Sequence, residues 1–248
     1  MKKIVSAIIL LVITISANAQ MPGYLGRRLE VGFDLMMSPH ISGGLNNGTF
    51  GIPVNMRMGL HVDYAKSRKW TFGLSYTMLP SSFDHNAYGY YDANDNYVNL
   101  PIEEHKFKQL SHTIAFRFYS PRNGDLAPPL GFFWGYELGI GIAVAKDVDG
   151  TLPDLKGAFT KGRTVTSILP HWDWIMGRKM AFGERWLFST GVNIGITGIF
   201  GGLINYVFYE DGSTSLTEIN KNVKRQNALR YYSQDMVSLN FGISYLIK

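Results

Sequence analysis

The sequence predicts an all-β protein, namely an eight-stranded antiparallel transmembrane β-barrel with short periplasmic turns and long extracellular loops. Three observations predict it. Eight segments alternate large apolar residues with small or polar ones at a period of two, which is the period of a strand and not of a helix. The connections between these segments alternate between long and short, and a stretch with the features of an export signal precedes them all. An even number of strands with short turns at one end is typical of bacterial outer-membrane barrels.

Residues 1–19 have the three parts of a secretory signal peptide. Lys2 and Lys3 form a basic start, Ile4 to Ile15 is an apolar run, and Ala17-Asn18-Ala19 is a small-x-small cleavage site. The apolar run is shorter than the roughly 18 residues that a membrane helix needs. We therefore expect cleavage near Ala19, a single barrel domain at residues 20–248, and a location in the outer membrane of a Gram-negative bacterium.

Composition excludes several other classes of protein. The chain contains no Cys, which excludes a lipoprotein anchor and disulfide bonds. Loss of the signal lowers the formal net charge from +5 to about +3, which is too weak to indicate nucleic-acid binding. Every later apolar run is interrupted by Gly, Ser, Thr or a charge. The mature chain can therefore span a membrane only as a closed barrel.

The first three strands are predicted at Leu29–Met37, Asn55–Ala65 and Trp70–Met78. In each strand, large apolar or aromatic residues occupy one face, while the other face carries mainly Gly, Ser, Thr or ionisable residues. The second and third strands are separated only by residues 66–69. This connection is predicted to be a tight turn.

The fourth and fifth strands are predicted at Phe107–Tyr119 and Leu130–Val144. A long polar loop, from Leu79 to about Lys106, precedes the fourth strand, and a stretch rich in Pro, Asn and Gly leads to the fifth. The fifth strand has the most regular pattern. Its even-numbered residues are all large and apolar or aromatic, and its odd-numbered residues are small except for Glu137 and Phe133.

The sixth strand is the least regular, and it follows a polar loop that runs from Ala145 to about Thr164. Pro170 has no N–H group for a sheet ladder, so we place it above the membrane. A turn at residues 183–185 leads to the seventh strand, Trp186–Ile196. The longest loop then runs to about Gln234, and the eighth strand is predicted at Asp235–Ile247.

A soluble up-and-down barrel, such as a lipocalin, also has alternating strands but points its apolar face inward. The small residues of the polar face favour the membrane barrel, because the interior of an eight-stranded barrel is narrow and filled by side chains. A soluble exterior would instead be rich in Lys and Glu. Aromatic residues beside the short turns are predicted to form an interfacial girdle. Its members are Tyr64, Trp70, Phe118, Phe132, Trp186 and Tyr245.

Several short motifs carry a resemblance to a known family. They are G-Y-L-G-R-R at 23–28, S-H-T-I-A-F-R-F-Y at 111–119, A-P-P-L-G-F at 127–132, G-E-R-W at 183–186 and the closing aromatic strand. With these motifs and its signal peptide, the chain resembles the small bacterial outer-membrane β-barrel protein family, with an OmpA/OmpX/OmpW-like architecture. The resemblance covers nearly the whole mature chain and implies a fold more than a chemistry. In that family the last strand is the insertion signal and usually ends in an aromatic residue, whereas here Lys248 is last and Tyr245 is the final aromatic.

The polar face of the strands carries ionisable residues that are predicted to point into the lumen. Because a buried charge is costly unless it is paired, we expect these residues to form ion-pair networks across the barrel that specify strand register. A polar path or a proton-linked site is the functional alternative. The predicted lumen network consists of Asp34, Arg57, His61, Arg117, Glu137 and Asp173, and Glu30, Asp63 and His171 share its face.

His112 stands out among the apolar residues of the predicted lipid face of the fourth strand, next to Ser111. A lipid-modifying enzyme would need a His and a Ser within hydrogen-bond reach. Adjacent strand residues point to opposite faces, so this pair cannot act together and His112 is interpreted as interfacial. The sequence predicts no catalytic residue.

Two features of the long loops resemble binding sites. Residues 92–103 resemble a calcium loop, but Tyr97 replaces the Gly that such a loop requires. The sequence therefore predicts no metal site and no cofactor. Tyr-rich stretches, which include Tyr231 and Tyr232, indicate either an exposed binding surface or packing between loops.

These patterns predict a non-enzymatic outer-membrane protein with a structural or surface-interaction role through its long loops. Two alternatives remain: a narrow channel or transporter for small or hydrophobic solutes, and a lipid A-modifying enzyme. The expected partners are outer-membrane lipid and lipopolysaccharide, together with the barrel-insertion machinery, which would read the C-terminal strand. Nucleic acid is not an expected partner.

Overall fold

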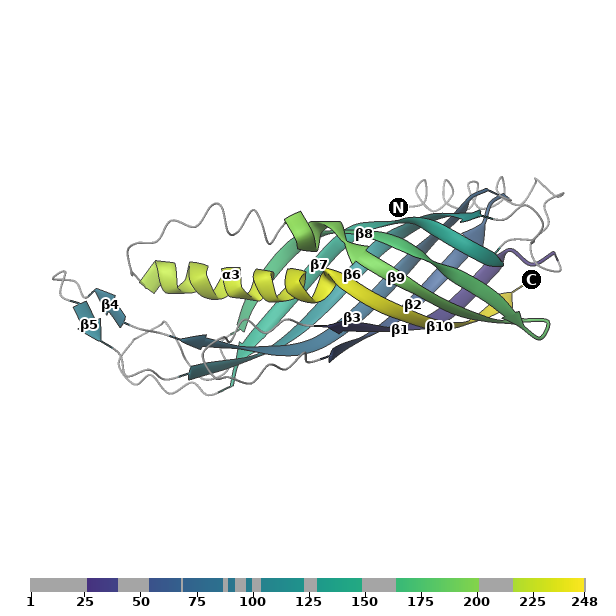
Figure 1. Cartoon of the computed structure of the whole chain (residues 1–248). Coiled ribbons are helices and arrows are strands. Elements are labelled where there is room, and N and C mark those ends of the chain that lie inside the picture. Colours follow the sequence, from purple (N-terminus) through teal and green to yellow (C-terminus); the bar gives the residue numbers. More distant parts are fainter. Residues whose placement is uncertain are drawn as a thin grey trace, which may run out of the picture.

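The computed structural model describes residues 26–39, 54–67, 69–86, 89–91, 97–99, 104–122, 129–148, 164–200 and 216–247. Eight of its strands form one sheet: β1 (Leu29–Pro39), β2 (Val54–Ala65), β3 (Thr71–Asn86), β6 (Glu104–Arg122), β7 (Gly131–Asp147), β8 (Thr164–Phe182), β9 (Trp186–Gly195) and β10 (Val237–Ile247). They close in the order β1-β10-β9-β8-β7-β6-β3-β2, and every pair is antiparallel (Figure 1). The predicted eight-stranded antiparallel barrel is confirmed.

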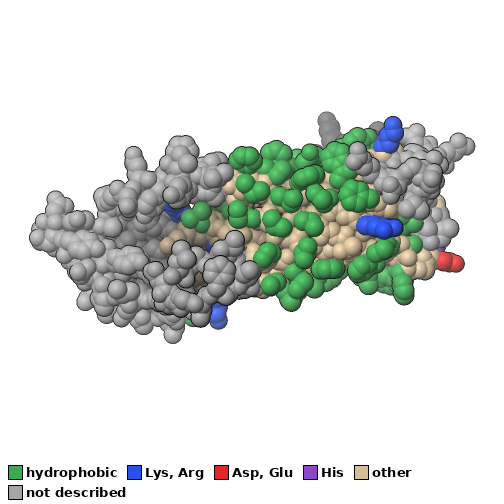
Figure 2. Space-filling view, viewed as in Figure 1, with side chains coloured by type: hydrophobic (Ala, Val, Ile, Leu, Met, Phe, Trp, Pro, Cys, Tyr) green, Lys and Arg blue, Asp and Glu red, His purple; other side chains and the backbone are tan. Residues whose placement is uncertain are grey.

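Large apolar side chains cover the outside of the barrel, and polar side chains are buried inside it. Leu60 and Ile114 are 58% and 59% exposed, whereas their strand neighbours His61 and Thr113 are buried. Figure 2 shows hydrophobic side chains gathered over the strand region of one face. The arrangement follows from the period of two, because each strand alternates between the outer face and the lumen.

The strands β3 and β6 pair further than the sequence predicts. Residues Leu79–Asn86 pair with Glu104–Ser111, so the predicted loop from Leu79 to about Lys106 is wrong at both of its ends. A short hairpin, β4 (Gly89–Tyr91) with β5 (Tyr97–Asn99), lies in the same connection. In these additional paired residues, Ser, Lys and Gln are mixed with the apolar residues. The alternation of apolar and polar residues is therefore lost, although the backbone hydrogen-bond ladder continues.

A helix, α3 (Leu216–Asp235), occupies part of the predicted longest loop. It ends at Asp235, so the assignment of Asp235 to the eighth strand is wrong, and Ile196 belongs to a helical turn at 196–200 rather than to the seventh strand. The helix has no continuous apolar stripe, which is the pattern by which a helix is normally found in a sequence. Among the described residues, no helix is both long and apolar enough to cross a membrane.

The irregular sixth strand is a full strand, β8, in which Pro170 pairs with Ile140 of β7. On its other side, pairing with β9 begins only at Asp173, which is opposite Gly195. At Pro170, β8 is therefore paired with β7 alone. Since no strand is paired on the β9 side at this position, proline interrupts no hydrogen-bond ladder there. The position of Pro170 relative to a membrane stays a prediction.

Candidate functional site

The first group of buried polar residues comes from β1, β2, β6 and β8 and is called here the Lys179 cluster: Glu30, His61, Asp63, Tyr119 and Lys179. Lys179 Nζ lies 2.8 Å from both carboxylate oxygens of Glu30 and 3.2 Å from Asp63 Oδ2. It also donates to the Tyr119 hydroxyl at 2.7 Å, and that hydroxyl donates to Asp63 at 2.9 Å. The ammonium group therefore neutralises two carboxylates that lie directly opposite each other on β1 and β2.

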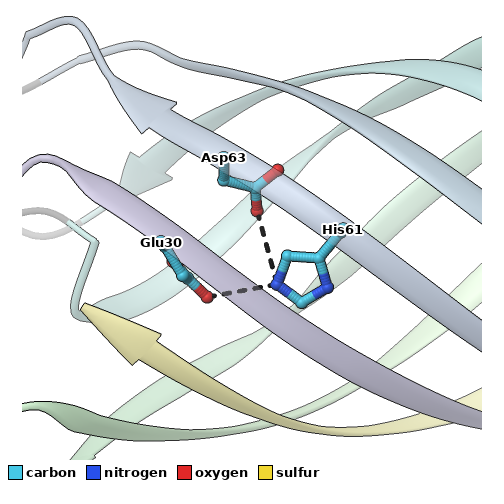
Figure 3. Close-up of side chains that lie close together, drawn as sticks. All are labelled: Glu30, His61 and Asp63. Carbon is cyan, nitrogen blue, oxygen red and sulfur yellow. Dashed lines mark hydrogen bonds and ion pairs between the residues drawn. The ribbon is translucent and has the colours of Figure 1, made fainter. Parts of the chain in front are cut away.

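His61 connects this cluster to the rest of the lumen. Its Nε2 atom lies 3.3 Å from Glu30 Oε1 and 3.9 Å from Asp63 Oδ2, as Figure 3 shows. Its Nδ1 atom lies 2.8 Å from Asp34 Oδ2. A side chain at Gly32 would overlap the His61 ring, so this close approach requires glycine.

Arg117 lies at the centre of the network and joins its two halves. Its Nη1 atom lies 3.4 Å from Asp34 Oδ2 and 3.7 Å from Asp63 Oδ2, while Nε forms an ion pair with Glu137 Oε1 at 2.9 Å. Arg117 and Glu137 are directly opposite each other on β6 and β7, so strand register alone brings them together.

The second group, called here the His171 cluster, consists of Glu137, His171 and Asp173. Glu137 and Asp173 are directly opposite each other on β7 and β8. His171 Nε2 lies 3.6 Å from Asp173 Oδ2 and 4.0 Å from Glu137 Oε2, and Nδ1 lies 3.0 Å from Asp235 Oδ2. All three side chains are at most 3% exposed. Asp173 Oδ1 has no hydrogen-bond partner in the described part of the chain.

The C-terminal half of α3 enters the barrel from one end and closes onto this network (Figure 1). Along one face of the helix, buried side chains recur every four or three residues. They are Val223, Asn227, Tyr231 and Gln234. Asn227 accepts from the Gln109 amide at 2.7 Å and donates to the Ala143 carbonyl at 2.8 Å. The helix thus docks through polar contacts to the inner faces of β6 and β7.

Two residues of α3 reach the charged network itself. Asp235 forms an ion pair with Arg57 at 2.5 Å and accepts from His171. The Tyr231 hydroxyl lies 2.9 Å from the Thr113 hydroxyl and 3.2 Å from His171 Nδ1. Tyr231 and Tyr232 are buried and not exposed, so for these two residues packing replaces the predicted binding surface. The other loop tyrosines, residues 92–96 and the signal peptide lie outside the residues whose side chains are described.

We expect Gly141→Ala to loosen this docking, because the added methyl group would overlap the Tyr231 ring. Overpacking of this kind costs about 1–3 kcal/mol. Faster hydrogen exchange in residues 223–235 would report it. Gly59→Ala is the matched control, because a Cβ there first meets Thr77 Cγ2 at 3.0 Å and does not touch α3. Equal exchange in the two variants would contradict the expected role of Gly141.

All six predicted lumen residues are buried and belong to this one network. Three members were not predicted: Tyr119, Lys179 and Asp235. Lys179 has a signal in the sequence, because it is six residues after Asp173 and therefore shares its face of β8. Asp235 has none, because it reaches the lumen from a helix.

The network holds more negative than positive groups. Three permanent cations, Arg57, Arg117 and Lys179, face six carboxylates, with two imidazoles between them. The carboxylates of this network are Glu30, Asp34, Asp63, Glu137, Asp173 and Asp235. Buried charges need partners, so protons on the two imidazoles or on a carboxylate, or a further cation, must balance this difference.

Ser111 and His112, the pair considered for lipid chemistry, lie on opposite faces of β6. Ser111 is buried on the lumen side, whereas His112 lies outside and its Nδ1 atom is 2.7 Å from the Tyr76 hydroxyl.

The six girdle residues lie beside the short connections. Four of the six pack in pairs. The rings of Trp70 and Phe118 stack with their centroids 4.6 Å apart, and the rings of Trp186 and Tyr245 meet edge-on with their centroids 5.1 Å apart. Their role at a membrane interface stays a prediction.

The sequence matches no family model and no curated protein. Among solved structures, the chain is similar to Ail, the attachment invasion locus protein of Yersinia pestis, crystallised alone and with the heparin analogue sucrose octasulfate. The complex is 9% identical with a TM-score of 0.39, over 89% of this chain and 97% of that one. It is also similar to the N-terminal β-barrel domain of Pseudomonas aeruginosa OprF, at 8% identity and a TM-score of 0.35, over 88% and 97%. These values are too low to carry an argument about function.

Proposed function

We propose that the protein is an integral outer-membrane β-barrel with a non-enzymatic, structural or surface-interaction role. The observation that carries the proposal is the inverted arrangement of its side chains. Large apolar residues on all eight strands point outward, and the ionisable residues of the lumen network are buried. Such an exterior is unfavourable in water and favourable in lipid, where closure of the barrel also satisfies every strand edge.

The filled lumen supports a structural role over a conduit. The Lys179 cluster and the side chains of α3 occupy the space that a solute would cross, and their polar groups are largely paired with one another. Neutralising Glu137 or Arg57 would change conductance only if the lumen conducts. The third hypothesis, a lipid-modifying enzyme, loses support because Ser111 and His112 lie on opposite sides of the barrel wall.

The proposed membrane location also implies two kinds of partner, the barrel-insertion machinery and lipopolysaccharide. The strand β10 closes the barrel by pairing with both β1 and β9, which supports its role as the segment that the insertion machinery would read. The long connections 40–53, 87–103, 148–163 and 196–236 all leave from one end of the barrel. At that end they would meet lipopolysaccharide or other surface molecules.

Replacing an outward apolar residue with Arg tests the membrane location. Ile114 lies midway along the apolar part of β6, so we expect Ile114→Arg to destabilise the barrel in liposomes by about 2–4 kcal/mol. Phe182 is 78% exposed and adjoins the turn at Gly183, where the same change should cost about 0–1 kcal/mol. Urea titration followed by the band that shifts on boiling in SDS gels measures both variants.

Two results would count against the proposal. Small, equal effects in the two variants, with a wild-type protein that stays soluble without detergent and shows no band shift, would exclude the membrane barrel. A steady single-channel conductance of the wild-type protein in planar bilayers, lost in Glu137→Gln, would replace the structural role with the conduit.

A further inference from the structure

The lumen contains two copies of one arrangement of ionisable residues. In each copy a strand carries His-x-Asp, and a Glu lies directly opposite the Asp on the neighbouring strand. His61 and Asp63 of β2 face Glu30 of β1, and His171 and Asp173 of β8 face Glu137 of β7. Two carboxylates opposite each other repel, so each copy needs a cation.

The first copy has its cation in the chain. Lys179 Nζ lies within 3.2 Å of both carboxylates and donates to them, and Tyr119 completes its surroundings. In the second copy Arg117 pairs with Glu137 Oε1 at 2.9 Å, whereas among the described residues Asp173 forms an ion pair with no Arg or Lys. We propose that the His171 cluster binds one divalent transition-metal ion, such as Zn²⁺, through Glu137, His171 and Asp173.

The orientation of the imidazole supports metal binding. A carboxylate only accepts hydrogen bonds, so His171 Nδ1 carries the hydrogen that it shares with Asp235 Oδ2 at 3.0 Å. The Nε2 atom faces Asp173 and Glu137 and, once it has lost its hydrogen, would present a lone pair to an ion held between them. A histidine that binds a metal almost always donates its other N–H in this way, and the partner fixes the ring.

The two carboxylates are also arranged as ligands. Arg117 holds Oε1 of Glu137 and leaves Oε2 facing His171. Asp173 is 1% exposed, and its Oδ1 atom has no hydrogen-bond partner in the described part of the barrel. A buried carboxylate oxygen without a partner is costly, and a bound cation would satisfy it.

The distances fit a small ion after a modest adjustment. The ligand atoms of the three residues all lie within 4.8 Å of one another, with 3.6 and 4.0 Å from His171 Nε2 to Asp173 and Glu137. Bonds from a tetrahedral Zn²⁺ would place such atoms about 3.3–3.6 Å apart. One nitrogen and two carboxylate oxygens suit Zn²⁺, Mn²⁺, Fe²⁺ or Co²⁺, and a fourth position is left for water or for Asp173 Oδ1.

Metal content of the mature, untagged protein tests the proposal. The protein is refolded in detergent with Zn²⁺ or Co²⁺, dialysed, and measured by mass spectrometry for zinc and by visible absorption for Co²⁺. We expect about one equivalent per chain in the wild type. His171→Gln and Asp173→Asn should bind at least about tenfold more weakly, and Asp235→Asn, which removes the partner of the ligand, about 10–100-fold more weakly.

The matched control is His61→Gln in the Lys179 cluster, which should keep the full equivalent. A wild-type protein that shows the folded band on cold SDS gels but no Co²⁺ absorption would overturn the proposal, even if the variants fail to fold. Equal metal content in His171→Gln, Asp173→Asn and the wild type would also overturn it, because the metal would then lie elsewhere. These results do not depend on the proposed surface role.

Discussion

Replacing Lys179 with Met is expected to lower the free energy of unfolding by about 3–5 kcal/mol, because the change leaves buried carboxylates without their cation. Lys179 Nζ contacts both oxygens of Glu30 and one oxygen of Asp63. These two side chains are 1% exposed, so water cannot replace the ammonium group without opening the barrel. Among the described residues, Glu30 would then keep only His61 as an ion-pair partner, and Asp63 would keep His61 and Arg117 at the longer distances of 3.9 and 3.7 Å.

The expected loss of unfolding free energy depends on the charge of the side chain and on its position in the barrel. Adding Glu30→Gln to Lys179→Met should recover part of the stability, because the carboxylate that loses its closest cation is then neutral. Lys69→Met, at an exposed position in the short connection between β2 and β3, is the control and should stay within about 0.5 kcal/mol of the wild type. Urea titration with the heat-modifiable band as readout measures all variants. A loss below about 1 kcal/mol in Lys179→Met would show that the pairing in this cluster is not needed.

The barrel could be predicted from the sequence because its exterior is unusually uniform. Residues such as Leu60, Ile114 and Leu138 are large, apolar and exposed, and each is flanked by small or polar neighbours. A period of two therefore persists over every strand that forms the apolar part of the wall. The prediction fails where β3 and β6 continue into Leu79–Asn86 and Glu104–Lys106, since backbone pairing there no longer coincides with an apolar face.

The helix α3 could not be predicted by the same means. A helix that packs on an apolar core shows an apolar stripe, but α3 packs on a polar lumen and buries Asn227 and Gln234. Its buried face therefore has the composition of a loop. The role of Asp235 was missed for this reason, although its neighbours in the network, Arg57 and His171, could be predicted to face the lumen.

The members of the charged network could be predicted better than their pairing. Strand parity places Glu137, Asp173 and Arg117 on the inner face, but which of them meet depends on the register of β6, β7 and β8. The register puts Glu137 between a cation on one side and a second carboxylate on the other. That juxtaposition, which underlies the proposed metal site, is visible only in the folded chain.

Replacing Arg57 with Met is expected to release α3 from the barrel while the strands stay paired. Arg57 and Asp235 are both at most 3% exposed and form an ion pair at 2.5 Å. Without Arg57, the Asp235 carboxylate keeps only the His171 imidazole as a close ion-pair or hydrogen-bond partner among the described residues, and docking should weaken by about 3–5 kcal/mol. The remaining contacts of the helix, such as those of Asn227 with Gln109 and Ala143, are neutral hydrogen bonds worth about 0.5–1.5 kcal/mol each.

Hydrogen exchange resolved by segment distinguishes release of the helix from global unfolding. Protection should fall in residues 223–235 and persist in β6 and β7, because the barrel ladder does not depend on α3. The double variant Arg57→Met with Asp235→Leu should regain part of the protection, since no charge is then left unpaired between the two elements. Arg185→Met removes an exposed arginine whose side chain donates a hydrogen bond to the Tyr245 hydroxyl, away from the helix, and should change nothing in α3. Loss of protection in the strands and the helix together would mean that Arg57 stabilises the whole barrel rather than the docked helix.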